Sequence, residues 1–241
     1  MNVTGTVVAL QRYPVKSMLG ERLDSAEVTA NGIAGDRTHA LLDVETGKIA
    51  SAKQPRLWRD LLTMSYAEAD EEVLSRRLGR RVRLVKEAPD GTYLDRARPD
   101  EVLEQGVDAV VGVDRSGLAP GTFFDFAALH IITTASLKLV GRSDFERYRP
   151  NVVVETDELE YDWVGRSIHI GQATVRVIVP TPRCAVPTLA HGAWPADTDA
   201  LRVPSRINRH EIPGQGMLPC VGVYASVERA GRIALGNEVR A

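Results

Sequence analysis

The chain has 241 residues, of which 44% are hydrophobic and 26% are charged, and its formal net charge is −2. This balance is ordinary for a globular protein and gives no strong basic field, which argues against nucleic acid as a partner. No apolar run approaches the roughly 18 residues of a membrane span, and the N-terminus lacks a secretory signal pattern. The length corresponds to one large domain or two small ones.

Cysteine and lysine are both scarce. The two cysteines, Cys184 and Cys220, form neither a CxxC pair nor a zinc-binding pattern. They could form one disulfide, but the better expectation is a reducing, cytoplasmic location. Only 5 residues are Lys whereas 25 are Arg, so each lysine is a candidate for a specific role. Cys184 follows an arginine between prolines, whereas Cys220 is typical of strand packing.

In chain order, β-branched and alternating stretches separated by turn residues predict a series of short strands. They lie at residues 3–14, 22–37, 38–51, 61–69, 81–88, 129–133, 149–155, 165–180, 220–231 and 232–239. A helix is expected at 70–80 with Gly79 as its stop, and shorter helices are expected after Thr133 and at 203–210. Residues 89–121 show no clear period and indicate a loop-rich connection. The pattern predicts a mainly β fold with minor helices, as a barrel or a sandwich.

Three groups of polar residues stand at strand ends or turns, where binding sites gather. Lys16 and Ser17 follow the first strand and could bind a phosphate, or lie on a solvated turn. Arg37 follows two turn glycines and could add a second cation, or pair with the preceding aspartate. Arg149 and Asn151 offer a planar guanidinium and an amide that suit a heterocycle or a phosphate, or they brace a loop.

The fourth group is the pair Arg183 and Cys184. A neighbouring guanidinium favours the thiolate form of cysteine, which is a soft ligand for transition metals. A lone cysteine is also commonly a small apolar filler. The five histidines form no HExxH pattern, which argues against a zinc hydrolase. Taken together, cations, an amide and one thiol suit a polyanionic, heteroaromatic cofactor that carries a soft metal.

Six stretches, in the order YPVKS, GDR with the following LLD, SAKQPRL, TTASL, RPN and PRC, resemble the MOSC proteins, named for the C-terminal domain of molybdenum cofactor sulfurase. The chain is most similar to the branch with an N-terminal β-barrel extension, which includes the amidoxime-reducing component family. The resemblance implies a MOSC β-barrel of the pyruvate-kinase-barrel type at 96–241. It also implies an N-terminal MOSC-associated β domain at 1–95, with an interwoven arrangement left open.

The resemblance further implies a molybdenum cofactor, Mo-molybdopterin, whose metal takes Cys184 as its protein ligand. By position, the phosphate side would be bound by Lys16, Ser17 and Arg37. The pterin and the metal would be lined by Asp125, Ser136, Arg149, Asn151 and Arg183. Arg183 would hold the thiolate, and Asp125 would handle a proton or orient the pterin. Lys53 lies in a matching stretch without an assigned role.

Two segments depart from the family pattern. Residues 181–184 read Thr-Pro-Arg-Cys, where the most similar enzymes have Cys-Ser-Arg-Cys. Residues 189–200 replace an Asp-Pro-x-Thr-Gly stretch of the family. This second segment is expected to line the substrate mouth, and His191 is the histidine that could meet a substrate there.

The function implied by the resemblance is a molybdenum oxidoreductase that reduces N-hydroxylated or N-oxide small molecules by oxygen-atom transfer. Two alternatives stay open: a sulfur carrier or transferase with a persulfide on Cys184, and a cofactor carrier without turnover. The chain has no GxGxxG motif and too few cysteines for an iron–sulfur cluster, so a separate ferredoxin or flavoprotein reductase is expected to supply electrons. Nothing in the sequence supports pyridoxal phosphate as a cofactor.

Overall fold

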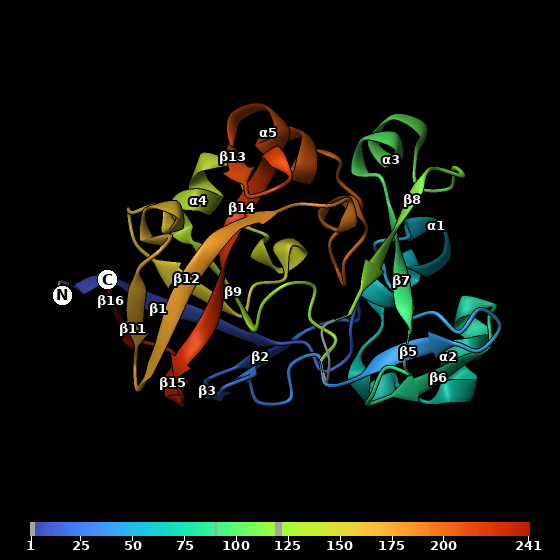
Figure 1. Cartoon of the computed structure of the whole chain (residues 1–241), viewed down its shortest axis with the longest axis horizontal. Helices are drawn as coiled ribbons and strands as arrows, with labels where there is room; N and C mark the ends of the chain where they lie inside the picture. Colours follow the sequence, from blue (N-terminus) through green and yellow to red (C-terminus); the bar gives the residue numbers. More distant parts are fainter. Residues whose placement is uncertain (1–2, 90, 119–121) are drawn as a thin grey trace.

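The computed structural model describes residues 3–89, 91–118 and 122–241, and the left half of Figure 1 is a closed β-barrel. Seven strands form a ring in the order β10-β9-β14-β12-β11-β16-β1, and the ring closes because β1 also pairs with β10. Within the described ring, β9 and β10 are parallel and the other pairs are antiparallel. The bounds are β1 Val3–Arg12, β9 Leu129–Thr133, β10 Val152–Glu155, β11 Ser167–Ile170, β12 Ala173–Pro182, β14 Gly216–Arg229 and β16 Glu238–Arg240. The expected mainly β fold is therefore confirmed, as a barrel rather than a sandwich.

The barrel core follows from the two-residue period of its strands. On β12, buried Val175 and Val177 alternate with exposed Arg176 and Ile178. The inward residues of the ring pack around Trp163, which has no exposed surface. β1 pairs with both β10 and β16, so the first residues of the chain complete a barrel built from the last ones. The two termini accordingly lie side by side in Figure 1.

The right half of Figure 1 consists of small sheets and short helices around a second core that includes Met18, Trp58 and Leu74. Two two-stranded antiparallel sheets lie here: β5 Ala40–Asp43 with β6 Val82–Val85, and β7 Tyr93–Ala97 with β8 Val113–Gly117. The other strands are β2 Glu21–Leu23, β3 Ser25–Thr29, β4 Gly32–Ile33, β13 Arg209–Ile212 and β15 Gly231–Ala234. The α-helices of the whole described chain are α1 Pro55–Trp58, α2 Glu71–Leu78, α3 Pro99–Gln105, α4 Thr134–Leu139 and α5 Asp199–Ile207.

Helix ends that the sequence marks by capping residues are confirmed. The Asp70 side chain accepts from the backbone N–H of Glu72 and Val73 at the start of α2, and Gly79 ends that helix at φ 62°. Thr133 caps α4 by accepting from the Ser136 N–H. The third expected helix is α5, which begins four residues before the predicted range of 203–210.

Two stretches are not what the sequence pattern predicts. Residues 61–69 form no strand but parts of two 3-10 helices, η1 Arg59–Thr63 and η2 Tyr66–Glu68. Leu61 and Met64 are both buried and lie three positions apart. This spacing matches the three residues per turn of a 3-10 helix rather than the two-residue period of a strand. The expected loop-rich connection at 89–121 instead contains β7, α3 and β8 within its described part. Residues 90 and 119–121 of that prediction lie outside the described residues.

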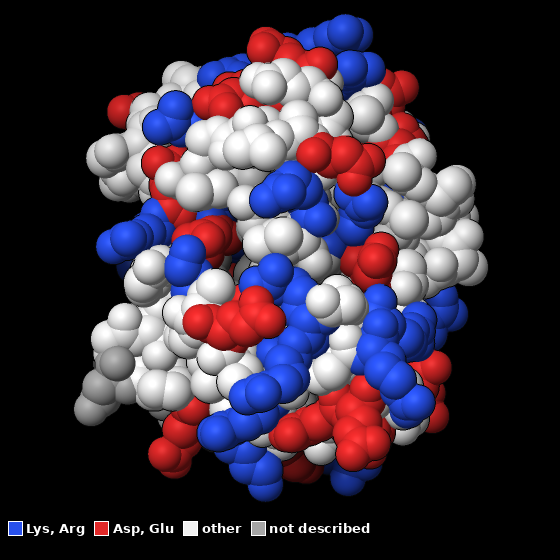
Figure 2. Space-filling view, turned by 90° about the vertical axis from the view of Figure 1, so that its right-hand side faces the viewer, with Lys and Arg blue, Asp and Glu red and all other residues white. Residues whose placement is uncertain are grey.

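Charges of both signs are mixed on the surface. Figure 2 shows the face at the right of Figure 1, where Lys and Arg side chains run through the middle with Asp and Glu side chains beside them. This mixture fits the formal net charge of −2. Among the helices that the structure describes, none has the length and apolar character needed to cross a membrane.

Candidate functional site

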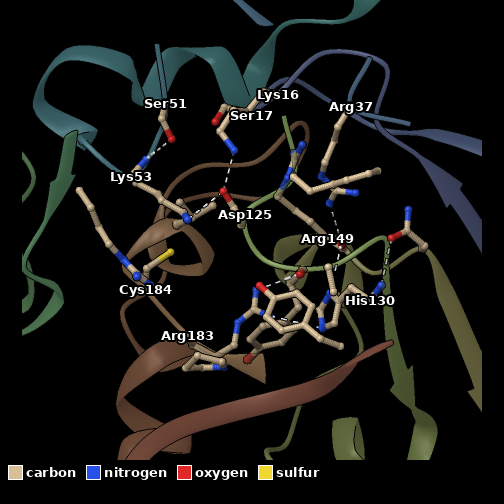
Figure 3. A pocket seen from close by; sticks show the side chains of 18 residues that line it. Lys16, Ser17, Arg37, Ser51, Lys53, Asp125, His130, Arg149, Arg183 and Cys184 are labelled. Carbon is tan, nitrogen blue, oxygen red and sulfur yellow. Dashed lines mark hydrogen bonds and ion pairs between the residues drawn. The ribbon is translucent and has the colours of Figure 1, made fainter. Parts of the chain in front are cut away.

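A pocket lies where residues beside several strand ends of the barrel meet residues of the second half (Figure 3). Its lining residues are Lys16, Ser17, Arg37, Ser51, Lys53, Arg96, Phe124, Asp125, Ala127, His130, Tyr148, Arg149, Asn151, Pro182, Arg183, Cys184, Val186 and Tyr224. The empty space measures about 730 Å³ when the solvent at the mouth is included. All but one of the residues that the sequence assigns to the cofactor, the metal or the chemistry lie in this lining.

Ser136 is the exception, because it lies outside this lining. The residue is fully buried in the first turn of α4, and its hydroxyl lies 3.2 Å from the Tyr161 hydroxyl. Because Thr133 caps this helix through the Ser136 N–H, the TTASL stretch is explained by helix initiation. Ser136 is therefore not carried further as a cofactor-binding residue.

The segment 189–200, expected to line the substrate mouth, lies outside the lining of this pocket, and that expectation stays a prediction. None of its described residues is in the lining. His191 is 3% exposed and borders a separate hollow that is also lined by Tyr13 and Trp194. Burial, together with the charge of Arg149, lowers the pKa of His191 to about 3, so its ring is neutral at physiological pH.

One carboxylate joins two lysines in the pocket (Figure 3). Asp125 Oδ1 lies 2.6 Å from Lys16 Nζ and 2.8 Å from Lys53 Nζ. Lys16 Nζ also donates to the Phe123 carbonyl at 2.9 Å. Burial would raise the pKa of Asp125, but the two ammonium charges outweigh it and hold that pKa well below its usual range. Asp125 is thus ionised, and the three side chains together retain one positive charge.

Lys16 is also buried, with 4% of its surface exposed. Burial disfavours the charged form of a lysine and therefore lowers its pKa, whereas it raises the pKa of a carboxyl group. Desolvation lowers the pKa of Lys16 to about 8, although the charge of Asp125 counteracts it. A lysine with this pKa can exchange a proton near neutral pH. An anion bound beside Lys16 would restore its charge.

Two arginines lie over the ring of Tyr13. The guanidinium carbon of Arg37 lies 4.7 Å from the ring centroid and that of Arg149 lies 4.2 Å from it. Arg37 forms an ion pair with Asp36 and donates to the Arg149 carbonyl at 3.3 Å. Arg149 Nη1 donates to the Met18 carbonyl at 2.6 Å, but its Nη2 is buried without a hydrogen-bond partner in the described structure. Burial lowers the pKa of Arg149 to about 10, and the charge of Arg37 adds to this effect.

Backbone strain is concentrated in this lining. In the described part of the chain, the non-glycine residues with positive φ are Ser17 at 63°, Arg37 at 49° and Arg149 at 57°. All three line the pocket. Such conformations cost about 1–3 kcal/mol each, and they persist where surrounding structure enforces them, commonly at binding sites.

The pair Arg183 and Cys184 follows directly after β12. Arg183 Nη2 donates to the Tyr148 carbonyl at 2.9 Å, and Nη1 lies 3.4 Å from the Val221 carbonyl oxygen. Its Nε is buried and has no hydrogen-bond partner among the described residues. The Cys184 side chain is free and 8% exposed. Arg183 is therefore fixed by backbone carbonyls while one of its donors remains available.

Several lining residues were not selected from the sequence: Lys53, Arg96, His130, Tyr148 and Tyr224. Lys53 had a signal, because it is one of only five lysines and it lies in a family-like stretch. Burial and the nearby Arg183 lower the pKa of His130 to about 3, so this histidine is neutral.

Asn151 lines the pocket, yet its amide is already committed to the fold. Its Oδ1 accepts from the His130 N–H at 3.1 Å, and its Nδ2 donates to the Gln11 carbonyl at 3.3 Å. These bonds connect the residue directly before β10 to strands β9 and β1. Asn151 therefore braces the pocket wall.

The composition of the lining tests which group it can hold. Six lining side chains are cationic, and two carboxylates oppose them, Asp125 in the lining and Asp36 behind Arg37. Among the described residues, no cluster of three His, Cys, Asp or Glu could hold a metal ion by itself. One thiol and an excess of cations fit an anionic cofactor that brings further metal ligands of its own. The residues present therefore fit a molybdopterin with Cys184 as protein ligand.

Fold and site together define a β-barrel protein with a thiol-bearing pocket that is lined mainly by cationic polar groups. The MOSC N-terminal beta barrel domain matches residues 4–97, and the MOSC domain matches residues 121–240. The chain therefore belongs to the MOSC family, in the branch with the N-terminal β-barrel domain.

Two curated relatives are named mitochondrial amidoxime reducing component 2. The protein from Macaca fascicularis is 28% identical, and the match covers 98% of this chain and 83% of the relative. The protein from Homo sapiens is 25% identical with the same coverage. Among solved structures, the YUAD protein from Bacillus subtilis matches with a TM-score of 0.46 and 16% identity over 98% of this chain and 94% of that one.

Proposed function

We propose that this protein is a molybdenum-cofactor-dependent oxidoreductase that reduces N-hydroxylated or N-oxide small molecules. The observation that carries the proposal is the pocket in which Cys184 and six cationic side chains face the same space. The names of the curated relatives support the amidoxime class of substrate. The reaction consumes two electrons and two protons per N–O bond that is broken and releases water.

The protein's part is to bind and orient the cofactor, which supplies the redox chemistry when bound. Lys16, Lys53 and Arg37 would bind its phosphate, because their positive charges exceed the local carboxylates. The unpartnered Nη2 of Arg149 and Nε of Arg183 would donate to acceptors of the heterocycle. Cys184 would be the protein's ligand to the metal.

The roles of the remaining polar groups follow from their protonation. Asp125 is ionised, so we assign it to orienting the two ammonium groups rather than to donating a proton. Burial raises the pKa of Tyr224 to about 12, so its hydroxyl stays protonated and can donate a hydrogen bond into the pocket. Lys16 can exchange a proton at Nζ near neutral pH.

A separate protein is proposed as the electron donor, either a ferredoxin or a flavoprotein reductase. The sequence has no GxGxxG motif and only two cysteines. Both cysteines are buried and free, and they lie in different core clusters.

Turnover by the isolated chain tests the proposal. The protein is produced in a host that synthesises molybdenum cofactor and is given benzamidoxime with reduced viologen, or with NADH alone. We expect amidine formation with viologen and none with NADH. Failure with every reductant at full molybdenum loading would contradict the reductase and favour the sulfur-carrier or cofactor-carrier alternative. NADH-driven turnover by the pure chain would contradict the need for a partner.

A further inference from the structure

The stretch between the two family-matched ranges builds a separate feature beside the pocket. Neither family domain includes residues 98–120. The structure describes this stretch up to residue 118, and it contains α3 and β8. In Figure 1, α3 stands at the upper right, next to the loop that follows β12. We call residues 98–112 the cap segment.

The cap segment closes on itself at its base. The Arg98 N–H donates to the Gly112 carbonyl at 3.0 Å, and the Gly112 N–H donates to Glu101 Oε2 at 2.7 Å. These bonds join the first and last residues of the segment. The segment is therefore a defined unit on the β7–β8 hairpin rather than an irregular loop.

Among the described residues, the polar contacts that join its outer part to the rest of the protein are weak. Arg59 Nη1 lies 2.5 Å from Asp108 Oδ1, but the Asp108 side chain is 80% exposed. Arg202 Nη2 donates to the Leu103 carbonyl at 3.4 Å on the surface. Exposed pairs of this kind contribute little to stability. Apolar packing must therefore supply most of the attachment.

That packing meets the loop that carries the thiol. Buried Val102 and half-buried Val107 and Val111 pack with Ala185 in one apolar cluster. Val107 also packs against a second cluster that contains Cys184. Val107 is thus the cap residue that contacts the apolar surroundings of both Cys184 and its neighbour.

We propose that the cap segment holds the Cys184 loop in place and limits access to its thiol, with Val107 as the positioning residue. The 8% exposure of Cys184 agrees with such a cover. This inference goes beyond the proposed reaction, because it concerns the access of any reagent to the thiol. It stands or falls independently of cofactor binding and turnover.

Alkylation of the thiols in the folded, cofactor-free full chain tests the proposal. Iodoacetamide modification is followed with time by mass spectrometry of the peptides that contain Cys184 and Cys220. We expect Val107→Ala to speed modification of Cys184 by about five- to tenfold, because removing two methyl groups weakens local closure of the cap. Val107→Ile keeps the apolar contact and should retain the wild-type rate.

Val110→Ala is the matched control, because this valine lies in the same segment and is 81% exposed. Its Cys184 rate should equal that of the wild type. An unchanged Cys184 rate in Val107→Ala would overturn the proposal. An equal acceleration at Cys220, which is fully buried away from the cap, would also overturn it, because this would indicate general loosening. A Val107→Ile rate as high as that of Val107→Ala would contradict the packing role.

Discussion

Two buried charge clusters in this protein are built differently. In one, Arg142 and Arg147 meet Asp144 and Asp197, so two cations face two carboxylates. No nitrogen of these arginines is buried without a partner in the described structure. In the pocket, six cations face two carboxylates, and nitrogens of two arginines lack partners.

The difference separates a structural cluster from a binding one. A neutralised and fully hydrogen-bonded cluster has no capacity left for a ligand. Arg147 also donates to the carbonyls of Leu189 and Pro195, which fixes the loop ahead of α5. The pocket cluster retains net positive charge, strained backbone and free donors, all of which an anionic ligand would stabilise.

Breaking the balanced cluster should have the largest effect on stability. Arg147→Met removes a 2% exposed cation and leaves the Asp144 charge incompletely paired. We expect the free energy of unfolding to fall by about 3–5 kcal/mol in urea titrations. Arg22→Ala, which removes an exposed ion pair with Glu146, should stay within about 0.5 kcal/mol. Similar losses for both variants would contradict the structural assignment of the cluster.

Removing a pocket cation should cost binding rather than stability. In Lys53→Met, Lys16 still neutralises Asp125, so the free energy of unfolding should change by less than about 1 kcal/mol. Cofactor retention should fall by about one to two powers of ten, because a charge-assisted contact is lost. Dilution and gel filtration of the loaded protein, followed by metal analysis, measure the retention. Full retention would remove Lys53 from the site.

The pocket should also bind anions in a pH-dependent way. Calorimetry can measure the affinity of the pocket for sulfate as a function of pH. Sulfate keeps its charge above pH 4, so any change in affinity comes from titration of the protein. Affinity should be constant below pH 8 and fall by up to about tenfold per unit above the Lys16 pKa of about 8. Lys16→Met should bind weakly with no break near pH 8. A break that survives this substitution would assign the titration to another group.

Lys16 also makes the free energy of unfolding depend on pH, and this dependence has the opposite sign to that of the anion affinity. The pKa of Lys16 is about 8 in the folded state, and the ordinary value is 10.5. Between these values the unfolded chain binds more protons than the folded one. The contribution of Lys16 to the free energy of unfolding therefore rises with pH across that window.

Relief of the backbone strain at Ser17 is expected to give the smallest change in the free energy of unfolding. Ser17→Gly and Ser17→Ala both lose the hydroxyl that accepts from the Ala52 N–H, but glycine tolerates the φ of 63°. The Gly variant should therefore be more stable than the Ala variant by about 1 kcal/mol. At Ser75, within α2, the order should reverse, because glycine is unfavourable in a helix. The same order at both positions would contradict the strain assignment.

The sequence predicts the barrel and most of the pocket because both depend on local signals. Alternation marks β12, caps mark α2 and α4, and the ordered motifs select Lys16, Arg149 and Cys184. Tyr224 and His130 carry no signal, because strand residues that face away from the barrel core look alike until the ring closes. Ser136 lies outside the pocket lining, which the sequence could not indicate because a motif records a position but not the side chain's direction. The cap segment was missed because α3 is short and shows no period.

The content of molybdenum and pterin tests the central claim most directly. Wild-type protein from a cofactor-producing host should carry about one equivalent of each, since the pocket offers one ligand thiol. Cys184→Ser should lose the metal while keeping the unfolding curve of the cofactor-free wild type, and Cys220→Ala should keep the metal. Wild-type metal content in Cys184→Ser, or none in any variant including the wild type, would contradict the claim that this pocket holds the cofactor.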